Sequence, residues 1–207
     1  MIFVLDNPNQ PSQHGNMHLI SIFDKSGPEK IAAPTPLEML LGCHARIRHF
    51  IQLSRTLATA ESVPPQEVAD AAAAIFRYFS LALPLHEADE DKSLLPRIQA
   101  ALPLGNLARE AAETMVEQHK AIDELAAELL SICSSLDRNP DRLPALARRL
   151  EHVTSALEQI FAAHLRLEET VIFPVIQELL SPAQIEEMLA EMNERRRVPR
   201  GAIHLVQ

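Results

Sequence analysis

Apolar residues recur at helical spacing along four long stretches of this 207-residue chain. In the first stretch these positions are Leu37, Leu40, Leu41, Ile47 and Ile51. Their intervals place them on one face of an α-helix. Because the same period returns in three later stretches, the pattern predicts four long helices, over about residues 35–60, 66–95, 107–137 and 143–173.

Capping sequences and prolines indicate where the helices begin and bend. Thr35–Glu38 offers a threonine N-cap, a proline at the first helical position and a glutamate at the third, which is a capping box. Ser181–Gln184 is a second cap, and it predicts a short fifth helix that reaches about residue 196. Proline removes a helical hydrogen bond, so Pro84 predicts a kink in a second helix that stops near Leu95. Pro174 is expected to bend or end the fourth helix.

The expected fold class is all-α, with an antiparallel up-down four-helix bundle over residues 35–180. Aromatic residues make up 4% of the chain and there is no Trp, which favours helices over sheets. Residues 1–34 carry several Pro and Gly and no helical period, so they are expected to form an N-terminal arm, with one short extended segment at Leu19–Phe23. Residues 181–207 are expected to form a C-terminal helix and tail.

Charge and cysteine content narrow the functional classes. The net charge of -9 argues against nucleic acid as a main partner. Cys43 and Cys133 are too few for a disulfide scaffold. No targeting segment is apparent and no apolar run approaches membrane-spanning length, so we expect a cytoplasmic protein without a membrane partner.

A duplicated motif of histidine and glutamate supplies candidate metal ligands. His86 and Glu90 are four residues apart, as are His164 and Glu168, and in both copies a proline stands ten residues after the histidine. Residues four apart lie on the same face of a helix, so an imidazole and a carboxylate there can bind one metal centre. The first and third helices each add a lone inward histidine, so the chain halves into two similar hairpins related by a pseudo-twofold axis. The six candidate ligands are His44, His86, Glu90, His119, His164 and Glu168.

Six ligands of this kind indicate two metal ions. Imidazole and carboxylate without thiolate suit iron, manganese or zinc. A single zinc needs only about four ligands. Four histidines, two bridging carboxylates and one bridging oxygen would leave one open position on each of two octahedral ions. This count favours a redox-capable di-iron site that takes a diatomic or peroxidic ligand.

These motifs resemble the hemerythrin family in its bacterial HHE-domain branch, over roughly residues 36–180. The segments His86–Pro96 and His164–Pro174 carry the resemblance. It implies a four-helix bundle with a non-haem di-iron centre, bridged by two carboxylates and an oxo or hydroxo group, on the six residues above. The third helix departs from oxygen carriers, which have two histidines four apart, because Met115 precedes His119 by four and Asp123 follows it by four. This departure argues against reversible oxygen carriage and favours labile iron, NO or peroxide chemistry, or sensing.

Several functions stay open on this evidence. The first is binding, scavenging or sensing of O2, NO or peroxide. The second is an iron–sulfur cluster repair or NO-reducing protein, and the third is iron storage or buffering. Enzymatic activity is left undecided, with non-catalytic binding favoured, and a homodimer is one possible state of assembly.

Four further residues stand near the predicted ligands. Glu87 and Glu169 each follow a motif position, and we interpret them as neighbours that hydrogen-bond to ligands or face solvent, with direct ligation as the alternative. Asp123 is a possible additional ligand. Tyr78 lies two helical turns before His86 and is interpreted as an ordinary buried tyrosine. His49 and His152 are out of register with the ligands and are expected to be exposed.

Overall fold

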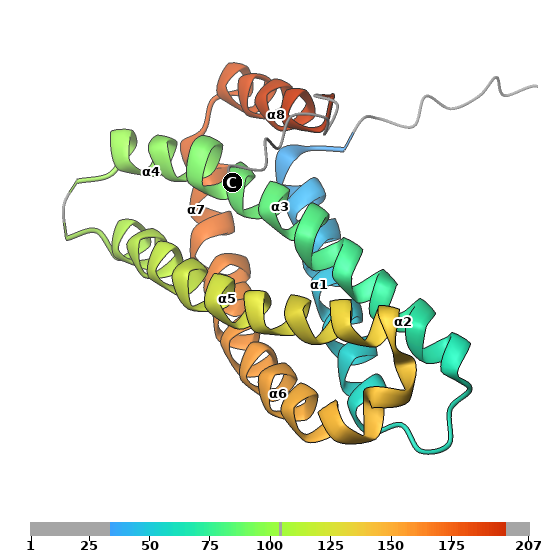
Figure 1. Ribbon diagram of the computed structural model, residues 1–207. Helices are drawn as coiled ribbons and strands as arrows, with labels where there is room; N and C mark the ends of the chain where they lie inside the picture. The colour runs from blue at the N-terminus through green and yellow to red at the C-terminus, as the bar shows by residue number, and fades with distance from the viewer. Residues whose placement is uncertain (1–33, 104, 198–207) are drawn as a thin grey trace, which may run out of the picture. The chain divides into compact units, whose positions relative to one another are not determined.

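The computed structural model describes residues 34–103 and 105–197, and within them every regular element is helical (Figure 1). The expected all-α fold class is confirmed. The predicted arm before Pro34, with its extended segment at Leu19–Phe23, lies outside the described residues, as does the tail after residue 197. The α-helices are α1 (Pro36–Ala58), α2 (Pro65–Arg77), α3 (Leu83–Asp89), α4 (Leu95–Ala101), α5 (Leu107–Arg138), α6 (Leu143–Leu167), α7 (Phe173–Leu179) and α8 (Pro182–Arg197).

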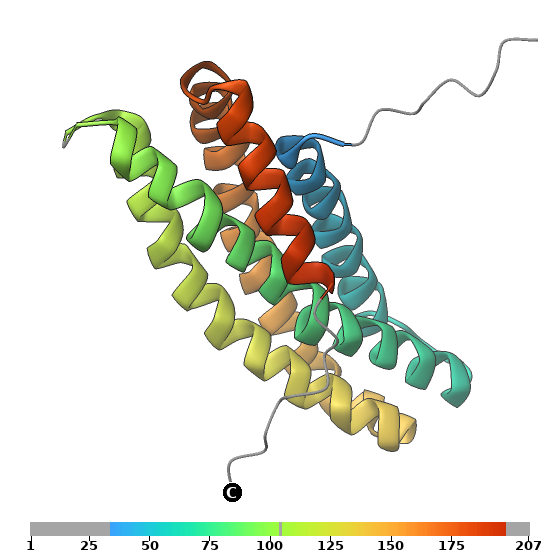
Figure 2. The same cartoon turned by 90° about the horizontal axis from the view of Figure 1, so that it is seen from above.

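The long helices pack as the sides of a four-helix bundle. α1 packs along α2 and α6, and α5 packs along the same two helices on the other side (Figures 1 and 2). Short connections at residues 59–64 and 139–142 make α1 antiparallel to α2 and α5 antiparallel to α6. The capping box at α1 is present, because the Thr35 side chain accepts from the Glu38 N–H while the Glu38 side chain accepts from the Thr35 N–H.

Three π-helical segments interrupt the second and fourth runs without breaking them. They are Tyr78–Ala82, Glu90–Leu94 and Glu168–Ile172. Each is followed by a residue whose N–H donates five residues back and which directly precedes a proline. In the regular α register, a proline ring would clash with the carbonyl four residues earlier, and the wider π turn relieves that clash. The second run therefore continues to Ala101 instead of stopping near Leu95, and the fourth continues past Pro174 through α7.

The apolar core has two parts. The loop-end cluster lies toward the α1–α2 and α5–α6 connections and includes Ile47, Ile51, Ile75, Ile122, Leu129, Leu150 and Leu157. The α8-end cluster includes Leu40, Leu94, Met115, Ile172, Ile176 and Met188. The predicted ligands fall between these two sets along each helix. His44, for example, comes after Leu40 of one cluster and before Ile47 of the other. The core thus holds a polar layer enclosed by apolar layers.

Helix α8 packs on α1, on α3 and on the Glu90–Leu94 segment (Figure 2). Asp89 is fully buried, and its carboxylate accepts from Arg195, with a 2.8 Å N–O distance, and from Arg196. Both arginines stand in the last turn of α8, where cations interact favourably with the helix C-terminus. They also neutralise a buried carboxylate on α3, the helix that carries His86.

One helical run meets a membrane-spanning criterion. Of the described residues, Pro65–Ala101 alone forms a helix that is long and apolar enough, by length and composition, to cross a membrane. The sequence-based expectation that no run approaches this length was therefore wrong. The observation is weak evidence for a membrane, since a core helix of a bundle passes the same test. In this fold the run supplies Val68, Ile75 and Phe79 to the loop-end cluster.

Candidate metal centre

The polar layer in the bundle core consists of the six predicted ligands, and each side chain is between 0% and 5% exposed. His44 comes from α1, His86 from α3, His119 from α5 and His164 from α6. Both glutamates stand at the first position of a π-helical segment, Glu90 in Glu90–Leu94 and Glu168 in Glu168–Ile172. The proline ten residues after each motif histidine therefore sets the turn that begins at the glutamate, which gives the repeated spacing a physical cause.

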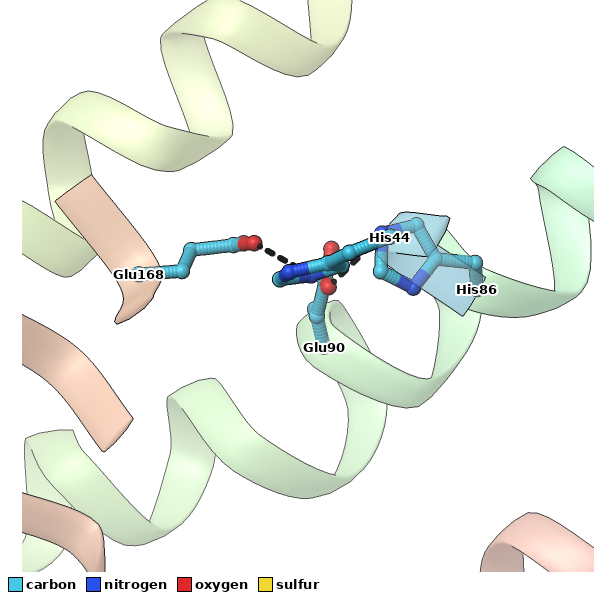
Figure 3. Close-up of side chains that lie close together, drawn as sticks. All are labelled: His44, His86, Glu90 and Glu168. Carbon is cyan, nitrogen blue, oxygen red and sulfur yellow. Dashed lines mark ion pairs between the residues drawn. The ribbon is translucent and has the colours of Figure 1, made fainter. Parts of the chain in front are cut away.

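The ligand atoms form two groups of four that share both carboxylates. The first is His44, His86, Glu90 and Glu168, shown in Figure 3, and the second is Glu90, His119, His164 and Glu168. Within each group the atoms lie within 4.8 Å of one another. Each hairpin thus supplies both histidines of one group, and each glutamate is common to the two groups. This is the pseudo-twofold arrangement expected from the duplicated motif.

Most of the close contacts inside the layer lack hydrogen-bond geometry; the exception is His119 Nε2, which is hydrogen-bonded to Glu90 Oε2 at 3.1 Å. His44 Nε2 lies 3.0 Å from Glu168 Oε2, and His86 Nε2 lies 3.0 Å from Glu90 Oε1. These atoms nevertheless have no partner with hydrogen-bond geometry, although they are buried. Unpaired buried polar atoms are costly, and a cation between them would satisfy several at once. The residues present therefore fit a metal centre.

The electrostatics of the layer also call for cations. Burial, followed by the nearby charge of Glu168, raises the pKa of Glu90 well above its usual range. Burial, followed by the charges of His44, His164 and His119, lowers the pKa of His86 well below its usual range. Burial also lowers the pKa of His164 to about 4. Metal binding requires neutral histidine and ionised carboxylate. The positive charge of a metal ion stabilises the ionised carboxylate in a dry core.

Three of the four histidines have an outer partner for Nδ1. His44 Nδ1 lies 2.8 Å from Glu169, and His119 Nδ1 lies 3.1 Å from Asp91. Glu169 and Asp91 directly follow the shared glutamates Glu168 and Glu90, so each lone histidine is held by the acid pair of the opposite hairpin. Such partners fix the ring orientation and leave Nε2 free to bind metal.

The remaining two histidines differ in their outer contacts. His164 Nδ1 lies 3.1 Å from the side-chain oxygen of Gln118 on α5. His86 Nδ1 is buried and has no hydrogen-bond partner among the described residues. Asp91 and Gln118 were missed from the sequence. The acid pair in both motif copies was a usable signal for Asp91, whereas Gln118 has no such signal.

The other candidate residues lie outside the two groups. Glu169 accepts from a ligand, as interpreted from the sequence, and Asp123 joins neither group. Burial, followed by the nearby charge of Asp123, raises the pKa of Glu87 to about 7. Tyr78 is buried, and its hydroxyl donates to the Cys43 carbonyl at 3.5 Å. His49 and His152 are exposed, as expected.

Replacing Glu169 by glutamine should weaken metal binding about 10–100-fold without abolishing it. Burial opposes ionisation of Glu169, but hydrogen bonds from His44 and Arg48 hold its pKa below the usual range, so the wild-type partner is an anion. Glutamine keeps an acceptor oxygen and loses the charge. Titration against a competing chelator measures the change, and Glu178→Gln on the exposed face of α7 is the matched control. Complete loss of one ion would instead identify Glu169 as a direct ligand.

The metal-free protein should lose stability as pH rises from about 6.5 toward 9. Burial alone would lower the pKa of His119, but hydrogen bonds with Asp91 and Glu90 raise it to about 10. A raised histidine pKa contributes stability that is complete below the unfolded value of 6.5 and is lost as pH approaches the folded value. The raised pKa values of Glu87 and Glu90 act in the same direction over this window.

Urea unfolding of the metal-free protein at several pH values tests this dependence. His119→Gln should flatten the slope, while His152→Gln, at an exposed site, should leave it unchanged. A metal-free wild type that becomes more stable between pH 6.5 and 9 would contradict the raised pKa of His119.

Comparison with known proteins finds a family match and a similar bacterial protein. Residues 110–206 match the family model described as Hemerythrin HHE cation binding domain. An uncharacterised protein of Haemophilus influenzae is 28% identical over 166 residues, which are 79% of this chain and 91% of that protein. The family match includes His119, His164 and Glu168 but begins after His44, His86 and Glu90. The assignment of the first three residues as candidate ligands therefore rests on the duplicated motif and on the packing.

Proposed function

We propose that this chain, which the family match and the helical bundle identify as a hemerythrin-like metal-binding protein, holds two non-haem iron ions and binds a small ligand such as NO, O2 or peroxide. The observation that carries the proposal is the sharing of Glu90 and Glu168 by two four-ligand groups. Two octahedral ions in these groups would not be saturated by protein. Iron would supply redox chemistry and open positions for the ligand.

The chain's own residues shield this site from bulk water and orient its ligands. The loop-end and α8-end clusters close the polar layer from both sides. Glu169 and Asp91 orient the two lone histidines. A dry, preoriented site strengthens electrostatic contacts to a bound ligand and excludes competing water.

The ligand set favours scavenging or sensing over reversible oxygen carriage. On α5 the position four residues before His119 is Met115, which is fully buried in the α8-end cluster. The second group therefore has two histidines and no third imidazole from α5. Fewer strong donors leave that ion more open and more labile.

Iron donation is the second candidate function, as in cluster repair or iron buffering. The hydrogen bond between His119 Nε2 and Glu90 Oε2, at 3.1 Å, favours it, because this nitrogen must give up that partner before it binds metal. Metal in the second group should then leave faster than metal in the first. Chelator-driven release in two resolved phases would support this candidate, and a single slow phase would contradict it.

Anaerobic purification with metal analysis tests the main proposal. We expect two irons per chain, followed in stopped-flow mixing by a spectral change with NO, O2 or peroxide. His119→Ala should lower metal content, because it removes a ligand from the second group. One zinc per chain, unaffected by His119→Ala and unreactive toward all three ligands, would overturn the proposal.

A further inference from the structure

A pocket of about 290 Å³ opens between α1 and α6 on the loop-end side of the polar layer. Its inner wall is apolar and is formed by Ile47, Ile51, Phe161 and Leu165, all of them 5% exposed or less. Arg48, Gln52 and Glu158 line its outer part; Arg48 and Gln52 are exposed and Glu158 is half-buried. The pocket thus has a polar mouth and an apolar floor.

The pocket floor is the layer of side chains next to the metal ligands. Ile47 follows His44 by one helical turn on α1, so the two side chains are neighbours on one face. On α6, the Phe161 ring centroid lies 6.2 Å from that of His164, and Leu165 stands one turn before Glu168. Only this single apolar layer separates the pocket from the two ligand groups.

Exposed ion pairs border the mouth at both ends. Arg48 Nη2 lies 2.9 Å from Glu169, which also accepts from the ligand His44. At the other end, Arg55 Nη1 reaches both carboxylate oxygens of Glu158, at 3.1 and 2.9 Å. Solvent-exposed pairs of this kind contribute little energy and open readily. The mouth therefore presents no large barrier to a small molecule.

We propose that this pocket is the docking site through which an uncharged diatomic gas, NO or O2, reaches the metal centre, a proposal that rests on the proposed function. An apolar floor favours a gas molecule over an ion or a strongly hydrated solute, because the latter would lose hydrogen bonds with water on entry. Apolar protein cavities also bind xenon, which makes xenon a probe of the site without any metal present. Peroxide, which keeps its water hydrogen bonds, is excluded from this route.

Two substitutions close the mouth from opposite walls without touching a ligand. Ala162→Phe acts from α6 and Gln52→Phe from α1, both at exposed positions. Ala147→Phe is the matched control, since Ala147 lies on the same helix in a different pocket near the α1–α2 connection. The two alanines are fifteen positions apart, which is about 22 Å along a helix.

Xenon binding to the metal-free full chain is the first measurement. Xenon pressurisation of crystals should place an atom against Phe161 and Leu165 in the wild type and in Ala147→Phe, and none in the two mouth variants. Absence of xenon from this pocket in the wild type would overturn the proposal. The xenon measurement does not depend on bound iron or on activity.

Stopped-flow association with NO is the second measurement, on chains loaded anaerobically with iron. Both mouth variants should bind NO about tenfold more slowly, with unchanged iron content and an unchanged rate with peroxide. Equal NO association rates in the wild type, the two mouth variants and the Ala147→Phe control would overturn the proposed route. Xenon in the pocket of a protein that reacts with neither gas would overturn the proposed function alone and leave the gas-binding pocket standing.

Discussion

Replacing Glu168 by alanine should remove both metal ions from the chain. Glu168 belongs to both four-ligand groups, so its loss would remove one ligand from each group. Glu90→Ala should act the same way for the same reason. By contrast, His44→Ala changes only the first group and should leave metal in the second. Metal analysis after anaerobic loading distinguishes the two classes of variant.

Thermal unfolding adds a readout that separates metal loss from misfolding. Metal at about a thousandfold its dissociation constant stabilises the wild type by about 4 kcal/mol, and Glu168→Ala should lose that increment. The metal-free variant should be as stable as metal-free wild type or more so, because it no longer buries unpaired carboxylate oxygens. Glu124→Ala, at an exposed site on α5, is the control. A Glu168→Ala chain that still binds two ions would contradict the shared-ligand assignment.

Replacing Arg195 and Arg196 together by alanine should destabilise the fold by about 3–5 kcal/mol. Asp89 is fully buried, and these two arginines are the partners of its carboxylate among the described residues. Their removal leaves an uncompensated charge beneath α8. Urea unfolding of the double variant measures the loss.

Two further variants separate charge from helix content. Arg197→Ala is the matched control, since that side chain is 78% exposed and its nearest acid, Glu194, is 3.8 Å away; the change should cost less than about 0.5 kcal/mol. Adding Asp89→Asn to the double variant should recover part of the stability, because the buried charge is then gone. A double variant as stable as Arg197→Ala would show that the Asp89 pairs contribute nothing.

Local sequence signals predicted the helices and identified the candidate ligands for the same reason. Helical period and caps depend on neighbours within four residues, so Thr35 marked the start of α1. The pairs His86 with Glu90 and His164 with Glu168 also lie within one turn. Because the pair is duplicated, the two copies could be assigned to one site although they are distant in sequence.

Features that depend on the register between helices could not be predicted. Pro96 looked like a helix end, because the sequence does not reveal that a π turn accommodates it and lets the run reach Ala101. Gln118 meets His164 only through the packing of α5 on α6. Likewise, Asp89 and Arg195 are more than one hundred positions apart, and only the docking of α8 joins them. The interhelical contacts are the information that the local patterns lack.

The crossed contacts of the lone histidines bear on how the chain could have arisen and how it could be divided. His44 meets Glu168 and Glu169 of the second hairpin, while His119 meets Glu90 and Asp91 of the first. Neither hairpin can complete a four-ligand group alone. A chain cut in the connection at residues 102–106 would yield two fragments, and neither would hold a complete four-ligand group. Metal binding would then require the two fragments to associate. An ancestral single hairpin would have needed a second copy of itself to hold metal at all.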